Sequence, residues 1–187
     1  MFVVGIDPGL TRCGYCVLAP PASGSDAEVR RGAPRSAANG WRAIAVGVLS
    51  TPTDAPSPRR LALLRVDVEE LFADYPPVAV AVERVLFQVN VSTAMAVGQA
   101  SGIVMAEAAR RGCEVVEYSP NQVKESVCGY GSADKSQVQE MVRRLLGHRR
   151  VFRPADAADA AAVALCHVAH MGAPVPGRAI GATAVGS

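Results

Sequence analysis

Four carboxylates lie inside segments whose other residues are apolar. Asp7 ends the run FVVGID, Glu83 ends VAVAVE, and Asp156 and Asp159 stand in PADAADAAAVAL. A buried, ionised carboxylate costs several kcal/mol unless a cation or hydrogen bonds compensate it. If the chain brings these acids together, they form an all-oxygen site, which suits Mg²⁺ or Mn²⁺ better than zinc or copper.

Such a site suits the hydrolysis of phosphodiesters. That reaction needs a nucleophilic water at neutral pH, charge neutralisation on the phosphate and a stabilised leaving alkoxide, which two Mg²⁺ ions about 4 Å apart can supply. We expect Asp7, the acid deepest in the core, to bridge the two ions, with Glu83 on one and the Asp156/Asp159 pair on the other. Without metal the carboxylates repel one another, so the pKa of at least one should rise.

The apolar periodicity predicts the elements that carry these acids. Period-two and β-branched runs predict strands at 2–7, 13–18, 42–49, 78–83 and 114–118. Helical spacing and capping residues predict helices at 59–73, from Asn90 or Ser92 to 111, 119–128, 134–147 and 155–171. This order describes a mixed α/β sheet, in which the acids converge if the first and fourth strands are parallel neighbours and the last helix crosses their ends.

Length and composition indicate one domain with a real core. The chain has 187 residues, 50% of them hydrophobic, and a net charge of +2, which does not by itself indicate nucleic acid. We expect the domain to span 1–171, with 19–40 as an exposed loop or insertion and 172–187 as a disordered tail. No membrane span or signal peptide is recognisable, so we expect a cytoplasmic protein in which Cys13 and Cys16 pack on opposite faces of a strand.

Two further patterns each allow two interpretations. Basic residues crowd the approach to Asp156, and they either contact nucleic acid or favour the negative end of the preceding helix; they are Arg143, Arg144, His148, Arg149, Arg150 and Arg153. Small residues recur every fourth position of the second helix, where they allow close packing either within the subunit or against a second subunit; they are Ala94, Gly98, Gly102 and Ala106.

Four ordered blocks of the sequence resemble the RuvC-type Holliday junction resolvases. The blocks are GIDPGLTRCGY, AVERVLFQVNVSTAMAVGQASG, SPNQVKESVCGYGSADKSQVQEMV and PADAADAAAVALCH. The resemblance implies an RNase H-like mixed five-stranded sheet flanked by helices, a homodimer, and metal-dependent paired nicks in four-way DNA junctions during recombination and repair. It carries Asp7, Glu83, Asp156 and Asp159 over as the metal site, and it implies a branch-migration partner of the RuvA and RuvB type.

The resemblance also implies contacts to the junction. Lys124 and Lys135 correspond to basic residues near the scissile strand, and Lys135 stands beside a capped helix start, where backbone N–H groups favour a phosphate. Many members carry an aromatic residue three positions after the glutamate, where this chain has Leu86 followed by Phe87. Either of these two could contact the bases. The remaining expected DNA contacts are Arg12, Asn90 and Arg153.

Three alternatives fit parts of the pattern. An actin-like kinase would explain GIDPG as a phosphate loop, but it needs a second domain for which the chain is too short. An RNA-processing nuclease of the same superfold would not usually combine the helix rich in small residues with the DAAD pair. An inactive DNA-binding module is disfavoured because all four acids are present.

Overall fold

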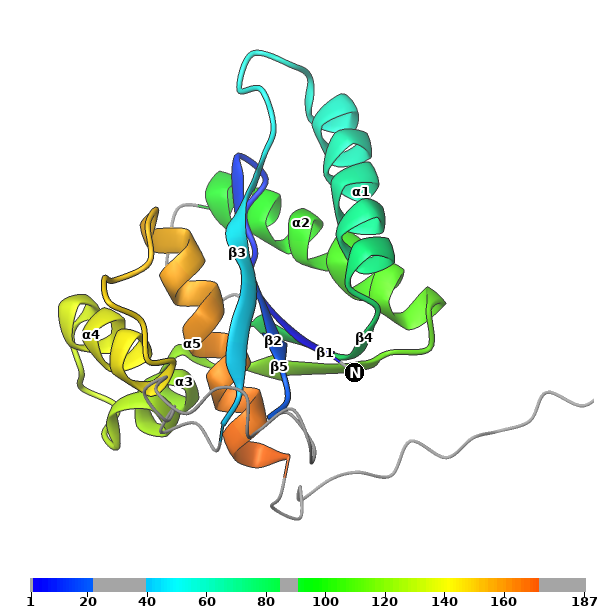
Figure 1. The fold of residues 1–187 in the computed structure, drawn as a ribbon. Coiled ribbons are helices and arrows are strands. Elements are labelled where there is room, and N and C mark those ends of the chain that lie inside the picture. The colour runs from blue at the N-terminus through cyan, green and yellow to red at the C-terminus, as the bar shows by residue number, and fades with distance from the viewer. Residues whose placement is uncertain (1, 22–39, 85–90, 172–187) are drawn as a thin grey trace, which may run out of the picture.

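A five-stranded sheet forms the centre of the molecule (Figure 1). The computed structural model describes residues 2–21, 40–84 and 91–171. The strands are β1 (Phe2–Asp7), β2 (Arg12–Ala19), β3 (Arg42–Ser50), β4 (Pro77–Glu83) and β5 (Glu114–Tyr118). Their order is β3-β2-β1-β4-β5, with β1 to β3 antiparallel and with β4 parallel to both β1 and β5. The predicted mixed sheet is therefore confirmed, with strand bounds within one residue of those expected.

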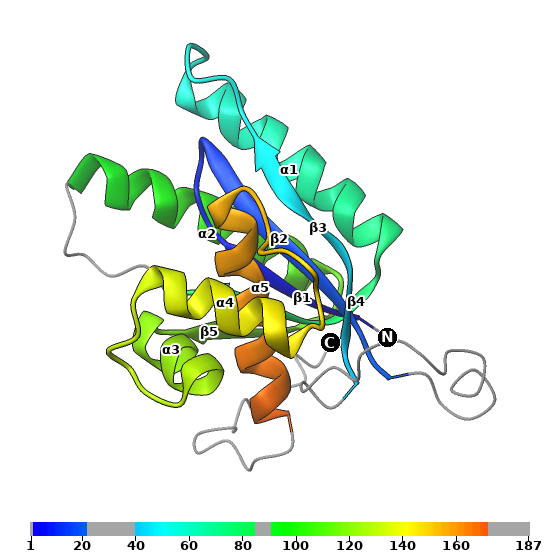
Figure 2. The same cartoon turned by 60° about the vertical axis from the view of Figure 1, so that its left-hand side comes forward.

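Helices cover both faces of the sheet (Figures 1 and 2). They are α1 (Ser57–Asp74), α2 (Val91–Arg110), α3 (Pro120–Cys128), α4 (Lys135–Leu145) and α5 (Ala155–His170). One core cluster joins α1 and α2 to one face of the sheet, and a second joins α3, α4 and α5 to the other. The interior strand β4 lies between β1 and β5 and is buried on both faces from Ala79 to Val82, as its continuous apolar run predicted.

The helix that carries two of the acids lies directly on the sheet. A Cβ atom added at Gly5 of β1 would overlap the carbonyl oxygen of Ala160, and one added at Gly14 of β2 would overlap that of Asp156. Only glycine therefore lets the backbone of α5 approach these two strands so closely. Ten of the helix's residues are buried, which explains its alanine-rich sequence.

Local capping residues fix the helices next to the acids. Asp134 caps α4 and accepts a hydrogen bond from the backbone N–H of Gln137 at 2.9 Å, as one of the two predicted caps. Ser119 forms a second capping box at the start of α3. At the end of α2 the predicted stop, Gly112, has a φ of +72°.

Other expectations have mixed outcomes. Cys13 and Cys16 are buried free thiols on opposite faces of the sheet, as predicted. None of the helices in the described residues is long and apolar enough to cross a membrane. Most of the expected loop at 19–40 and the whole of the expected tail at 172–187 lie outside the described residues, although Ala19 still belongs to β2.

Candidate active site

Two of the acids lie side by side at one edge of the sheet. Asp7 is the last residue of β1 and Glu83 the last residue of β4. The two strands run parallel, and Ile6 is paired with Val82, so the residues that follow emerge at the same edge. Asp7 is also paired with Gly14 of β2, the strand on its other side. The parallel neighbours assumed from the sequence are therefore present.

The other two acids reach this edge from α5. Asp156 and Asp159 lie in the first turns of that helix, three residues apart and hence on similar faces. The backbone of Asp156 rests on Gly14, beside Asp7. Asp159 lines a pocket of about 210 Å³ together with Glu83, Lys124 and Lys135. The sheet edge and the start of α5 thus bring all four acids into one region, as predicted.

The electrostatics of the sheet acids reflect this convergence. The pKa of Asp7 is raised to about 8, chiefly by burial and then by the charges of Glu83, Asp159 and Asp156. Burial also raises the pKa of Glu83, with Asp159 adding to the shift and Lys135 and Lys124 opposing it. The pKa of at least one carboxylate rises, as expected, but burial contributes more to the rise than the expected repulsion between carboxylates. Without a further cation, Asp7 carries a proton near neutral pH.

The helix acids are paired with basic side chains instead. Arg12 donates from Nε to Oδ2 of Asp156 at 2.8 Å, and Lys135 donates from Nζ to Oδ2 of Asp159 at 2.7 Å. Both pairs are partly exposed, with 31% of the Asp156 side chain and 22% of the Asp159 side chain accessible to solvent. Arg12 and Lys135, which the sequence assigned to DNA, are thus in contact with the acids themselves.

These acids fit a hard divalent cation by their chemistry, although their side chains do not converge on a single point. All the donors are carboxylate oxygens, and burial together with the neighbouring acids raises the pKa of Asp7, a shift that a bound cation would oppose. Within the described ranges, no three His, Cys, Asp or Glu side chains come close enough together to hold an ion. The ligating cluster expected from the sequence would therefore need the side chains of Asp156 and Asp159 to turn from their basic partners.

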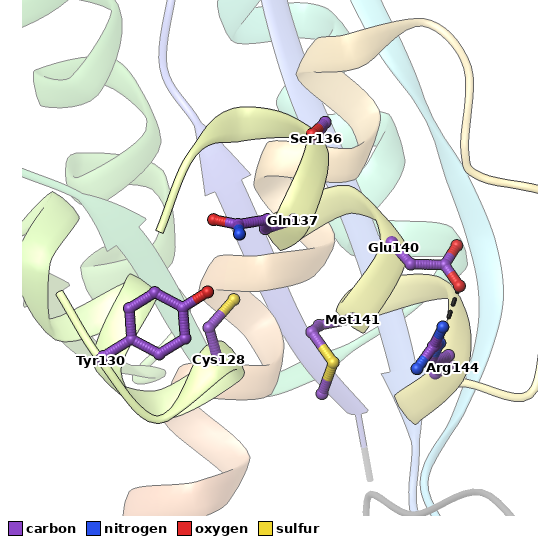
Figure 3. Close-up of a pocket in the computed structure, with 7 residues that line it drawn as sticks. All are labelled: Cys128, Tyr130, Ser136, Gln137, Glu140, Met141 and Arg144. Atoms are coloured by element: carbon purple, nitrogen blue, oxygen red, sulfur yellow. Dashed lines mark hydrogen bonds and ion pairs between the residues drawn. The ribbon is translucent and has the colours of Figure 1, made fainter. Parts of the chain in front are cut away.

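A second, larger pocket lies between the end of α3 and the helix α4 (Figure 3). Its volume is about 350 Å³, and none of the four acids lines it. Tyr130 and Cys128 form one side, while Met141 and the Glu140–Arg144 ion pair of α4 form the other (Figure 3). The chemistry of the site therefore belongs to the smaller pocket beside Glu83 and Asp159.

Comparisons with known proteins agree with this arrangement. The family model described as crossover junction endodeoxyribonuclease RuvC matches residues 3–167. The chain belongs to the RuvC family. A crossover junction endodeoxyribonuclease RuvC from Natranaerobius thermophilus is 42% identical over 167 residues, which cover 89% of this chain and 94% of that protein.

Two solved structures of RuvC from Thermus thermophilus share the fold. The first has a TM-score of 0.76 at 35% identity and covers 91% of this chain and 95% of that one. The second is RuvC in complex with a Holliday junction substrate, with a TM-score of 0.73 at 33% identity, covering 91% of this chain and 94% of that one. The fold is therefore RNase H-like, and the chain belongs to the class of crossover junction endonucleases.

The remaining predicted contacts of this RuvC-family endonuclease differ in outcome. Arg153 is exposed in the loop that leads into Asp156, as are Arg149 and Arg150. Arg143 and Arg144 lie in the last turn of α4, and both hydrogen bond to Glu140 of the same helix. The predicted contacts Leu86, Phe87 and Asn90 lie outside the described residues.

Sequence reasoning missed several residues that shape the site. Gly14 is needed for the approach of α5, and Thr51 and Arg60 hold the turn that follows Asp7. A hydrophilic Thr51 at the end of an apolar strand was a usable signal.

Proposed function

We propose that this RuvC-family endonuclease resolves four-way DNA junctions by paired nicks that depend on Mg²⁺, with two ions held by Asp7, Glu83, Asp156 and Asp159. The observation that carries this proposal is the convergence of four carboxylates, with the pKa of Asp7 raised to about 8, at one edge of the sheet. A Thermus thermophilus relative bound to a Holliday junction substrate supports the choice of DNA.

The protein's own groups divide the work. Bound Mg²⁺ would lower the pKa of a water and neutralise charge on the phosphate and the leaving oxygen. Asp7 would lose its proton and bridge the ions, while Glu83 and the helix acids would complete their coordination. Mn²⁺ has the same preference for oxygen and should substitute.

Basic residues flank the acids on two sides and support a path for the scissile strand. Lys124 and Lys135 line the pocket next to Glu83, Arg12 pairs with Asp156, and Arg153 is exposed three residues before Asp156 in the chain. We assign all four to backbone phosphates, which bind lysine and arginine regardless of base sequence. The segment after β4, with Leu86, Phe87 and Asn90, remains our proposed contact to the junction bases.

A substrate panel tests this function. The protein is incubated with a synthetic immobile junction, a matched duplex and a matched single strand, with Mg²⁺, with Mn²⁺ and with a chelator. We expect symmetric nicks in the junction alone, and only with a divalent ion. Cutting of an RNA hairpin in preference to the junction would favour the RNA-processing alternative, and binding without any cutting would favour an inactive module.

We further propose that the enzyme acts as a homodimer that uses the exposed face of α2. Apart from the adjoining backbone of α2 itself, no described atom lies within 4 Å of a Cβ added at Gly98 or Gly102, and Ala106 is exposed. This part of the small-residue ridge therefore does not pack inside the subunit. Met95 on the same face is 60% exposed. Two cuts related by a two-fold junction axis require two sites related by the same symmetry, which an isologous interface provides.

The variant Gly98→Leu tests the dimer. A bulky side chain on this face should push the partner away, so we expect a monomer by light scattering and the loss of paired nicks. Ala73→Leu, which also places a large residue on an exposed helix position, is the control and should remain dimeric. A dimeric and active Gly98→Leu variant would move the interface to another surface.

Two further expectations, one partner and one location, rest on family membership alone. We propose a branch-migration complex of the RuvA and RuvB type as a partner, and the cytoplasm as the place of action. Assembly on a junction preloaded with such a motor, followed by size-exclusion chromatography, would test the first. Fractionation of cells with an antibody to the chain would test the second.

A further inference from the structure

The turn between β1 and β2 is held from outside by a buried hydroxyl. This turn, residues 8–11, directly follows Asp7 and directly precedes Arg12. Thr51, just after β3 and only 5% exposed, donates from Oγ1 to the carbonyl oxygen of Leu10 at 2.5 Å. Its backbone N–H donates to the carbonyl oxygen of Thr11 at 3.3 Å. One residue thus binds two consecutive carbonyls of the turn.

An arginine from α1 completes the contact. Arg60 donates from Nε to Oγ1 of Thr51 at 3.0 Å and from Nη2 to Oγ1 of Thr11 at 2.6 Å. The planar guanidinium offers these donors in a fixed fork, a geometry that a lysine ammonium cannot reproduce. The Thr51 hydroxyl donates to the turn and accepts from Arg60, so removal of it breaks both connections at once.

The held turn connects two parts of the catalytic site. At one end it fixes the end of β1, where Asp7 emerges. At the other end, Arg12 reaches Oδ2 of Asp156 on α5 at 2.8 Å. A continuous path of hydrogen bonds and backbone therefore runs from α1, through Thr51 and the turn, to the first turn of α5.

We propose that Thr51 and Arg60 form a positioning clamp that sets the position of Asp7 and Arg12 relative to Asp156. Neither residue is among the acids or the assigned phosphate contacts, and both act through the turn. The proposal rests on the proposed metal-dependent function. A displacement of about 1 Å at reacting groups can cost about a hundredfold in rate, so a clamp that holds the turn between Asp7 and Arg12 can affect cleavage without touching substrate.

The pair Thr51→Val and Thr51→Ser tests the clamp. Valine keeps the shape of threonine and removes the hydroxyl, whereas serine keeps the hydroxyl. For Thr51→Val we expect about a tenfold slower single-turnover cleavage in Mg²⁺, weaker Mn²⁺ binding by calorimetry without DNA, and junction affinity in Ca²⁺ within twofold of the wild type. Thr51→Ser should restore all three values to within about twofold.

Arg60 supplies a second test that does not depend on the folding of Thr51→Val. Arg60→Lys keeps the charge and loses the fork, so it should slow cleavage and weaken Mn²⁺ binding as Thr51→Val does. The double variant Thr51→Val/Arg60→Lys should lose less than the two single losses combined, because both changes break the same Arg60–Thr51 hydrogen bond. Circular dichroism confirms that each variant is folded at the assay temperature.

Several outcomes would overturn the clamp. A folded Thr51→Val or Arg60→Lys variant with wild-type cleavage and Mn²⁺ binding removes it, as does a serine variant as slow as the valine variant. If Arg60→Lys is normal while Arg60→Gln loses junction affinity, Arg60 is a DNA contact instead. Failure of the wild-type protein to cut junctions with Mg²⁺ would overturn the proposed function as well, which separates the two failures.

Discussion

The two pairs of acids reach the same place in opposite electrostatic states. Asp7 and Glu83 come from the sheet, are partly buried, and have raised pKa values. Asp156 and Asp159 come from α5, and each has a basic partner within 2.8 Å. The sheet acids therefore lack a cation that the helix acids already have. The difference indicates that bound metal would stabilise the ionised sheet acids most. At the helix acids the metal would have to replace Arg12 and Lys135.

The largest effect should come from Asp7. Asp7→Asn keeps the size of the side chain and removes the charge assigned to both ions, so we expect cleavage to fall by about a thousandfold or more. Junction affinity in Ca²⁺ should persist, because the phosphate contacts remain. Asp74→Asn, at an exposed position at the end of α1, is the control and should cut normally. Near wild-type cleavage by Asp7→Asn would refute the metal role of the sheet pair.

A smaller but still large effect should come from the close approach of α5 to β2, which brings the helix acids to the sheet acids. In Gly14→Ala the new Cβ would overlap the backbone of Asp156 and force α5 away from the sheet. We expect a loss of about 1–3 kcal/mol in the free energy of unfolding and slower cleavage in the folded protein. Gly131→Ala is the matched control, since its Cβ would meet only the flexible end of Glu125 at 3.3 Å. If both variants behave alike, the close approach of α5 is not needed.

The pH dependence of stability separates the pairs without any cleavage assay. In the folded, metal-free protein the pKa of Asp7 is about 8, against 3.8 for an ordinary aspartate. Between these values the folded state holds a proton that unfolding releases, so the free energy of unfolding should fall as pH rises through this window. Asp7→Asn should lack this contribution. The difference between the two proteins cancels other groups such as His167, whose pKa is lowered by burial.

Added Mg²⁺ sharpens the same measurement. An ion bound to ionised Asp7 favours the folded state at high pH, so Mg²⁺ should reduce the decline in the stability of the wild type as pH rises. Mg²⁺ should leave the pH dependence of Asp7→Asn unchanged. Chemical denaturation at pH 5, 6, 7 and 8, with chelator and with Mg²⁺, gives the four curves required. A wild-type curve parallel to that of Asp7→Asn in chelator would show that the sheet acids are not short of positive charge.

The sequence predicted the sheet acids better than the helix acids. The runs that end in Asp7 and Glu83 identify buried strands, and the parallel pairing assumed for those strands is present. The ion pairs of Asp156 and Asp159 join residues 144 and 24 positions apart, so no local pattern reveals them. The role of Gly14 was equally hidden, because it depends on a helix that begins more than a hundred residues later. Periodicity fixes elements, whereas contacts between distant elements decide which charges meet.

The smallest effects should come from the two lysines beside Glu83. Each phosphate contact contributes about −0.9 to the slope of log affinity against log salt on duplex DNA. Lys124→Ala and Lys135→Ala should each flatten the slope by roughly one unit and weaken binding to all junction sequences alike. Arg65→Ala, an exposed change on α1, is the control and should leave the slope unchanged.

The two lysines should differ in cleavage, because only Lys135 is bonded to one of the acids. Its Nζ lies 2.7 Å from Oδ2 of Asp159, so it can pass from that carboxylate to a phosphate as charge develops there. We therefore expect Lys135→Ala to lose more single-turnover cleavage in Mg²⁺ than junction affinity in Ca²⁺, and Lys124→Ala to lose both in proportion. Lys135→Arg keeps the charge and should recover the slope. Unchanged slopes together with unchanged cleavage would leave both lysines as ordinary surface charge and would confine the chemistry to the acids.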